Sequence, residues 1–288
     1  MRLLTFKYKN IISYGVITGD GVIDLGKHFG ARFASLRSAL TTDAREELKR
    51  FIEGRDIDLK LNEVEFLPVI PDPEKILCIG INYEKHRLET GRDKTEYPVI
   101  FTRFINTQVG QGQPLLRPKV SEKFDYEGEL AVIIGDRGRY IQAQDALKHV
   151  AGYACYNDAT VRDWQRHSSQ FTPGKNFPCS GGFGPWLVTT DEIADPNSLT
   201  LVTRLNGAEM QRTSTADMIY PVTQLIAYIS TFTELKSGDV IATGTPDGVG
   251  YRRTPPVYLR AGDRIEVEIS QIGTLANPIV DETSQDTE

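Results

Sequence analysis

The chain has 288 residues, 40% hydrophobic and 25% charged, which is typical of a globular protein with one large domain or two smaller ones. Its formal net charge of −6 would repel a phosphate backbone, so no nucleic-acid partner is expected. No apolar run approaches the roughly 18 residues of a membrane helix, and we expect neither a membrane span nor a signal peptide. The three cysteines, Cys78, Cys155 and Cys179, lie far apart in sequence, which predicts free thiols and a cytoplasmic protein.

Residues 1–66 differ in pattern from the rest of the chain. Short strand-like runs are broken by a Gly-Asp-Gly turn signal, and apolar residues over 33–54 recur at helical spacing, with Gly54 as a stop signal. The segment offers no cluster of catalytic residue types, so we predict a small N-terminal α+β accessory domain. Three prolines in residues 67–74 indicate a linker after it.

Residues 75–282 are dense in strand signals and form the predicted catalytic domain. One clear helix is expected, over 221–232, where apolar residues fall at i, i+3, i+4 and i+7. Many short strands and few helices predict a mostly β (α+β) fold, a sandwich or barrel. The polar tail, 283–288, is expected to be disordered. The predicted strands lie within 97–104, 129–135, 151–157, 184–190, 199–207, 238–244 and 263–269.

Several carboxylates are candidates for a metal site. Glu127 and Glu129 are two residues apart, so they share one face of a strand. A bare pair of this kind is more often a solvated strand face, but an apolar run follows it directly. Asp158 ends another apolar strand, and Asp125 is either a further candidate or a turn residue. Carboxylates without Cys or His donors favour Mg²⁺ or Mn²⁺, with Ca²⁺ possible.

Other residue types suit proton transfer and anion binding. His86 and Glu89 are neighbours on a helical turn, as a carboxylate-oriented general base requires, although a surface pair is the commoner explanation. Arg162 could grip a carboxylate and Gln165 could donate to an oxyanion. Lys175 lies in a Gly-rich stretch expected to be an irregular loop, and Thr245 lies in a glycine-rich turn suited to an anion.

The order and spacing of these signals resemble the fumarylacetoacetate hydrolase family over about residues 70–282. The matching motifs are, in order, G-x-N-Y-x-x-H-x-x-E, D-Y-E-x-E-L-A, G-Y-x-x-x-N-D-x-x-x-R-D-x-Q, K-x-F with G-P-W, N-G with a following Gln, and L-x-x-G-D-V-I-x-T-G-T-P-x-G-V-G. Six separated motifs agreeing in order make the resemblance specific. Within the family, the chain looks most like a bacterial two-domain acylpyruvase-type member.

The resemblance implies a mixed β-sandwich or β-roll catalytic fold, a bound Mg²⁺ or Mn²⁺ and a homodimer. The family's metal ligands would fall on Glu127, Glu129 and Asp158, and its lid His–Glu pair on His86 and Glu89. Its substrate-binding residues would fall on Arg162, Gln165, Lys175 and Thr245. One departure is Arg103, where many relatives carry Lys, and it is expected to contact a substrate carboxylate. Arg87 and the insert Tyr251–Thr254 are expected to shape the far part of the pocket.

The expected activity is hydrolytic cleavage of a carbon–carbon bond in a 1,3-diketo, acylpyruvate-type acid, as in aromatic or sugar acid catabolism. His86, oriented by Glu89, would activate water, while Lys175 and Gln165 would stabilise the oxyanion. Decarboxylation or isomerisation of a related keto acid on the same site is the alternative. A non-catalytic binding module with a structural metal is a more distant one, since it leaves His86 and Arg162 without a role.

Overall fold

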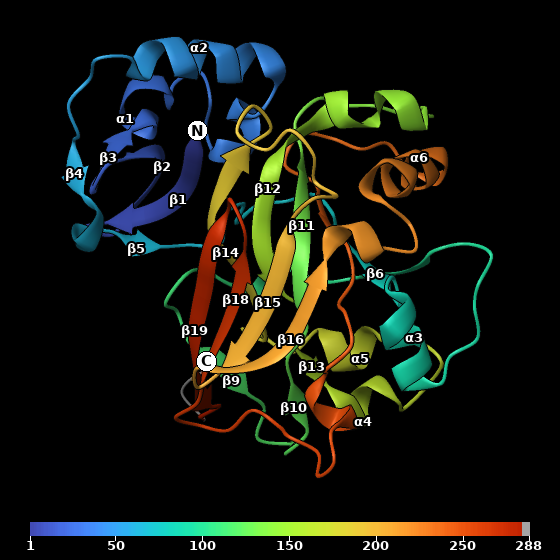
Figure 1. Cartoon of the computed structure of the whole chain (residues 1–288). Helices are drawn as coiled ribbons and strands as arrows, with labels where there is room; N and C mark the ends of the chain where they lie inside the picture. The colour runs from blue at the N-terminus through green and yellow to red at the C-terminus, as the bar shows by residue number, and fades with distance from the viewer. Residues whose placement is uncertain (284–288) are drawn as a thin grey trace.

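In the computed structural model, which describes residues 1–283, two packed sheets dominate the molecule (Figure 1). Of the tail predicted to be disordered, residues 284–288 lie outside the described part. The main sheet has twelve strands, ten of them in the order β4-β3-β2-β1-β14-β12-β11-β17-β6-β7, and a second sheet has the order β16-β15-β18-β19-β9. The mostly β prediction is confirmed.

The N-terminal residues extend the main sheet at one edge, at the upper left of Figure 1. Strand β1 pairs antiparallel with β14, with Arg2 opposite Val188 and Leu3 opposite Leu187. The elements of this segment are β1 (Arg2–Tyr8), β2 (Ile11–Thr18), β3 (Gly21–Asp24), α1 (Leu25–Phe29), the 3₁₀ turn η1 (Leu36–Ala39), α2 (Thr42–Ile52), β4 (Leu59–Lys60), η2 (Leu61–Glu63) and β5 (Glu65–Phe66). The proline-containing stretch predicted as a linker lies between β5 and β6.

The helix expected over 33–54 is two separate pieces, η1 and α2. The chain leaves the helical conformation at Thr41, whose side chain accepts a hydrogen bond from the backbone N–H of Ala44 and so caps a new helix. Apolar spacing alone could not locate this break, because Leu40 and Leu48 are buried on either side of it. Leu36 of η1 and Leu48 of α2 are buried in the core, whereas Phe51 and Ile52 at the end of α2 are only partly buried.

The rest of the main sheet supplies the scaffold of the candidate site. Its strands are β6 (Ile76–Gly80), β7 (Val99–Thr102), β8 (Gln108–Val109), β11 (Gly128–Ile134), β12 (Val150–Asn157), β14 (Gly181–Thr189) and β17 (Val240–Ala242). Strands β11 and β12 are buried along their whole length, as their continuous apolar runs require. A short pair, β10 (Phe124–Asp125) and β13 (Thr160–Val161), flanks them.

The second sheet covers one face of the main sheet and closes the larger core. It consists of β9 (Leu115–Arg117), β15 (Thr200–Leu205), β16 (Ala208–Ser214), β18 (Arg264–Ile269) and β19 (Gly273–Asp281). On β18, Ile265, Val267 and Ile269 are buried and alternate with more exposed residues, as predicted. Leu130 and Val132 of β11 share one core cluster with Val267 and Ile269. The arrangement is a sandwich with a mixed main sheet.

Helices cover the edges and the end of this sandwich. The predicted helix over 221–232 is present as α6 (Val222–Phe232). The others are α3 (Glu84–Thr90), α4 (Arg162–Gln165) and α5 (Thr172–Lys175), with the 3₁₀ turns η3 (Ile105–Thr107), η4 (Ala143–His149), η5 (Thr215–Asp217) and η6 (Gly250–Arg252). In Figure 1, α3, α4 and α5 gather below the main sheet. None of the helices in residues 1–283 is long and apolar enough to cross a membrane.

Candidate active site

Three carboxylates meet where β11 begins and β12 ends. Glu127 precedes β11, Glu129 lies within it, and Asp158 follows β12. The strands are antiparallel neighbours with Gly128 opposite Asn157, so their register brings the flanking residues together. One oxygen atom from each carboxylate lies within 4.8 Å of the others, and all three side chains are buried. The sequence-predicted metal ligands are therefore gathered at one point.

Two buried cations contact this carboxylate group. The Lys175 ammonium donates to Glu127 Oε2 and Asp158 Oδ2, each at 2.6 Å, and Arg162 Nη1 lies 2.6 Å from Glu127 Oε1. Burial acts to raise the pKa of Glu127, but Lys175, Arg162 and His86 together lower it to about 2. Lys175 was expected in an irregular loop. It instead ends α5, a helix of four residues, and is only 1% exposed.

Glu129 stands in a different environment from Glu127. Burial raises its pKa well above the usual value, and the neighbouring carboxylates of Asp158 and Glu127 raise it further. The backbone N–H of Gly244 donates to its Oε2 at 2.9 Å. Within the part of the chain that the structure describes, Glu129 has no ion pair with a basic side chain, so its negative charge is the least compensated of the three.

This donor set fits a hard divalent cation. It consists of buried carboxylate oxygens alone, which suits Mg²⁺, Mn²⁺ or Ca²⁺ better than Zn²⁺. A cation bound among them would supply the positive charge that Glu129 lacks. Glu127, Glu129 and Asp158 are the residues that would hold it, and Lys175 Nζ would have to share their oxygens or move aside.

Arg103 lies behind Asp158, outside the residues that line the cavity. Its fully buried guanidinium donates to Asp158 Oδ1 at 2.7 Å, to the carbonyl of Ala159 at 2.9 Å and to Ser180 Oγ at 2.6 Å. These contacts fix the carboxylate of Asp158 from the side away from the cavity. Contact between Arg103 and a substrate stays a prediction, and its position favours a role in orienting Asp158.

His86 and Glu89 form the expected pair on α3. His86 Nδ1 lies 3.2 Å from Glu89 Oε2, and the other oxygen, Oε1, accepts from the backbone N–H of Gly248 at 3.0 Å. A carboxylate can only accept here, so in the neutral ring Nδ1 carries the proton and Nε2 is the basic atom. His86 is buried and lines the cavity, whereas Glu89 stands behind it.

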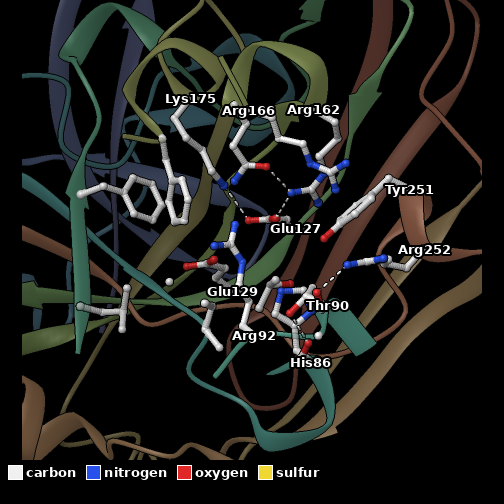
Figure 2. A pocket seen from close by; sticks show the side chains of 18 residues that line it. His86, Thr90, Arg92, Glu127, Glu129, Arg162, Arg166, Lys175, Tyr251 and Arg252 are labelled. Atoms are coloured by element: carbon white, nitrogen blue, oxygen red, sulfur yellow. Dashed lines mark hydrogen bonds and ion pairs between the residues drawn. The ribbon is translucent and has the colours of Figure 1, made fainter. Parts of the chain in front are cut away.

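The carboxylate group opens into a cavity of about 430 Å³, shown in Figure 2. Of the sequence-predicted residues, the cavity is lined by His86, Glu127, Glu129, Arg162, Gln165, Lys175 and Thr245. Tyr251 and Arg252 of the insert also line it, as expected, whereas Arg87 instead pairs with Glu84 at 2.7 Å. Arg92 and Arg166 also line the cavity and were not predicted from the sequence. Arg166 lies four residues after Arg162, a spacing that could have revealed it, whereas nothing marked Arg92.

The glycine-rich turn after β17 closes the site beside Glu129. Gly244 has a φ of +101°, and a Cβ there would lie 2.7 Å from the Cβ of Asn82. This conformation brings the Gly244 N–H onto Glu129. Thr245 Oγ1 donates to the carbonyl of Gly128 at 3.0 Å and accepts from Gln211 Nε2 at 2.9 Å. The turn therefore holds the start of β11 in place.

Asp125 contributes to the site without joining the carboxylate group. Its Oδ1 accepts from the backbone N–H of Gly250 at 2.9 Å, and its Oδ2 accepts from that of Tyr251 at 3.1 Å and from Arg162 Nε at 2.8 Å. The side chain is fully buried. Asp125 thus connects the insert to Arg162.

Comparison with known proteins places the chain in a family. Residues 75–280 match the model of the fumarylacetoacetate (FAA) hydrolase C-terminal domain, so the chain belongs to the fumarylacetoacetate hydrolase family. The resemblance found in the motifs is confirmed, and the chain is an enzyme of that family. The match begins at Lys75, the residue directly after the predicted linker.

Individual relatives and a solved structure are similar to this chain over most of its length. The chain is 37% identical over 288 residues to a mitochondrial oxaloacetate tautomerase of Xenopus laevis, covering 97% of this chain and 90% of that protein. It is 44% identical over 223 residues to the oxaloacetate tautomerase YisK of Bacillus subtilis, covering 76% and 74%. A solved structure, maleylpyruvate hydrolase of Sphingobium with manganese(II) and pyruvate, matches with a TM-score of 0.82 at 28% identity, covering 98% of this chain and all of that one.

Proposed function

We propose that this enzyme catalyses the divalent-cation-dependent keto–enol interconversion of a 2-keto acid, with oxaloacetate as the substrate. The observation that carries the proposal is a buried, carboxylate-oriented base, His86, which lines the same cavity as Glu127 and Glu129, two of the three carboxylates that fit a cation. The names of the relatives from Xenopus and Bacillus support oxaloacetate. This choice moves the emphasis from the hydrolysis expected from sequence to its stated alternative, isomerisation.

A divalent cation at Glu127, Glu129 and Asp158 would draw electron density from the keto and carboxylate oxygens of the substrate and acidify the adjacent C–H. His86 Nε2 would remove one proton from C3, and the electron pair would move to form the C2–C3 double bond. The same proton, returned to the C2 oxygen, completes the enol, so that no atom is gained or lost. Glu89, held by Gly248, keeps Nε2 turned toward the cavity.

Carbon–carbon bond hydrolysis remains the second candidate. The maleylpyruvate hydrolase neighbour supports it, and a His–Glu pair can activate water as well as abstract a C–H proton. The two reactions share the enolate and differ in whether water attacks a distal carbonyl. Their products separate them, because only hydrolysis of an acylpyruvate releases pyruvate together with a second acid.

An assay of both reactions tests the proposal. Enol oxaloacetate is added to the protein with Mg²⁺ or Mn²⁺, the loss of enol absorbance is followed, and pyruvate is measured in parallel with oxaloacetate and with acylpyruvates. We expect enol loss well above the protein-free rate without matching pyruvate. Pyruvate release from an acylpyruvate, with no acceleration of enol loss, would instead establish the hydrolase.

Replacement of the base gives a sharper version of this assay. His86→Gln should lower the tautomerisation rate by at least about a hundredfold, as expected for loss of a general base. His28→Gln makes the same chemical change on the exposed α1 and is the matched control. If His86→Gln keeps the parent rate, His86 is not the base.

Three further expectations stay predictions. A non-catalytic module with a structural cation would lose melting temperature rather than turnover on replacement of Glu127 by Ala, whereas an enzyme would lose turnover while staying folded. A measurement of the molar mass in solution tests the expected homodimer. The cytoplasmic location also stays a prediction, and the name of the Xenopus relative includes the word mitochondrial.

A further inference from the structure

The rim of the cavity carries an arrangement that the proposed chemistry at the carboxylate group does not use. Tyr251 in η6 has three arginines around its ring, with guanidinium carbons 4.3 Å (Arg162), 4.9 Å (Arg166) and 5.0 Å (Arg252) from the ring centroid. Figure 2 shows Tyr251 between Arg162 and Arg252. We call these four residues the Tyr251 cluster. All four line the cavity.

The positive charge of the Tyr251 cluster is only partly compensated. Arg162 pairs with Asp125 and Glu127, but neither Arg166 nor Arg252 forms an ion pair with a carboxylate in residues 1–283. Arg162 is only 4% exposed, yet its Nη2 is buried without a hydrogen-bond partner. A buried guanidinium nitrogen without an acceptor is costly, and an acceptor atom of a ligand bound beside Arg162 would relieve that cost.

The cluster is held in place before any ligand arrives. Asp125 fixes the backbone of Gly250 and Tyr251 and also Arg162 Nε. A Cβ at Gly250 would lie 2.1 Å from the carbonyl oxygen of Val257, so only glycine allows this close approach. Arg252 Nη2 donates to the carbonyl of Thr90 at the end of α3, at 2.5 Å. Stacking on one ring restricts the guanidinium groups further.

We propose that the Tyr251 cluster is a second anion subsite, which binds the distal carboxylate of a dianionic keto acid and selects it over monoanionic ones. This rests on the proposed function, in which the keto acid end of the substrate lies at Glu127, Glu129 and Asp158. Arg162 Nη2 and the guanidinium groups of Arg166 and Arg252 supply the donors, and planar guanidinium groups suit the two oxygens of a carboxylate. A neutral group there would leave Arg166 and Arg252 near one another without a carboxylate partner in residues 1–283.

The test compares oxaloacetate with its 4-methyl ester, which keeps the keto acid end and loses the distal charge. For the parent enzyme, kcat/KM should be higher for the dianion, mainly through KM. In Arg166→Ala and in Arg252→Ala, the ratio of kcat/KM for the dianion to that for the ester should fall about tenfold, the effect of one lost charge-assisted hydrogen bond. Arg166→Lys, which keeps the charge, should recover part of the ratio. Arg50→Ala, on the exposed face of α2, is the control for net charge.

The outcomes separate this inference from the proposed function. If the parent enzyme tautomerises both compounds and the ratio is unchanged in Arg166→Ala and Arg252→Ala, the anion subsite is wrong while the function stands. If the parent tautomerises neither compound, the proposed function itself fails. Because Tyr251 carries the stacked guanidinium groups, Tyr251→Leu should lower the ratio more than Tyr251→Phe, which keeps the ring. An equal effect of the two would contradict the role assigned to the ring.

Discussion

Glu129 is the residue whose environment depends most on a bound cation. Its pKa is raised above the ordinary value by burial first and by Asp158 and Glu127 next. An acid whose folded-state pKa is raised lowers stability at pH values above its unfolded pKa, and the loss is relieved as the pH falls through the folded value. At neutral pH without metal, Glu129 therefore destabilises the fold, and a cation would remove that cost.

Replacement of Glu129 by Gln should thus have opposite effects on stability and on metal binding. In EDTA at pH 7, Glu129→Gln should unfold at a higher temperature than the parent, because the uncompensated charge is gone. Its Mn²⁺ affinity, measured by calorimetry, should fall by at least about a hundredfold. Glu122→Gln, an exposed change of the same kind, is the control. Unaltered Mn²⁺ affinity in Glu129→Gln would remove Glu129 from the ligand set.

The residue type of Arg103 suggested contact with a carboxylate, but its position behind Asp158 could not be predicted from the sequence. Because its guanidinium is buried against Asp158, replacement by Met leaves Asp158 Oδ1, the carbonyl of Ala159 and the hydroxyl of Ser180 without the guanidinium donor. We expect Arg103→Met to lower the free energy of unfolding by about 3–5 kcal/mol, measured by denaturant titration without metal. Arg50→Met, made at an exposed position, serves as the comparison. A loss below about 1 kcal/mol would show that Arg103 does not hold Asp158.

Among the elements, the turn after β17 couples backbone conformation to the carboxylate group. Gly244→Ala would place a Cβ 2.7 Å from the Cβ of Asn82 at a φ of +101°. The turn must shift, and its N–H must move away from Glu129. We expect a loss of about 1–3 kcal/mol in the free energy of unfolding, together with weaker Mn²⁺ binding. Gly207→Ala, in a turn at φ +81° with open space around the Cβ, separates backbone strain from the effect on Glu129. Equal Mn²⁺ affinities in the two variants would contradict this coupling.

The sequence predicted the individual strands and helices well, but it predicted less well which residues meet when these elements pack together. The buried strands β11 and β12, the helix α6 and the helical pairing of His86 with Glu89 follow from apolar periodicity and spacing. The break at Thr41 does not follow from spacing, because a capping hydrogen bond determines where it lies. The short helix that ends at Lys175 does not follow either, because the burial of its ammonium group determines the local conformation. Arg166 and Tyr251 meet only through tertiary structure, since they belong to different segments.

For the whole molecule, the N-terminal segment and the catalytic region are physically continuous. They share the main sheet through β1 and β14, and one core cluster contains Leu3 and Val16 together with Ala131 and Leu187. The residue pattern of 1–66 and the prolines of 67–74 suggested separate domains, because a pairing between strands so distant in sequence leaves no local signal. We therefore propose that residues 1–66 fold together with the catalytic region rather than as an independent unit.

A polar contact at this junction gives a pH-dependent prediction. Asp191 lies 2.8 Å from Lys49 of α2, and its pKa is lowered to about 2. Burial acts to raise this pKa, but hydrogen bonds from Lys49 and Thr189 and the charges of the N-terminus and Lys49 outweigh the effect of burial. A depressed carboxyl pKa adds stability above the unfolded value, near 4, and this is lost as the pH falls toward 2.

Asp191→Asn should accordingly melt about 2 °C below the parent at pH 7, a small change because the pair is partly exposed. The difference should shrink between pH 4 and pH 2 and vanish below it. Scanning calorimetry across this range checks the prediction, with Asp195→Asn in the same loop region as the control. A difference that persists at pH 2 would mean that the charge of Asp191 does not stabilise the junction.

We propose that this fold brings a base and a cation site together to enolise a keto acid. Exchange of the C3 hydrogens of oxaloacetate with D₂O, followed by NMR in the presence of Mg²⁺, measures this step directly, whether or not a bond is later cleaved. We expect exchange far above the protein-free rate, with EDTA, Glu129→Gln and His86→Gln each reducing it toward that rate. Exchange no faster than without protein, at saturating Mg²⁺ and with a correctly folded enzyme, would contradict it.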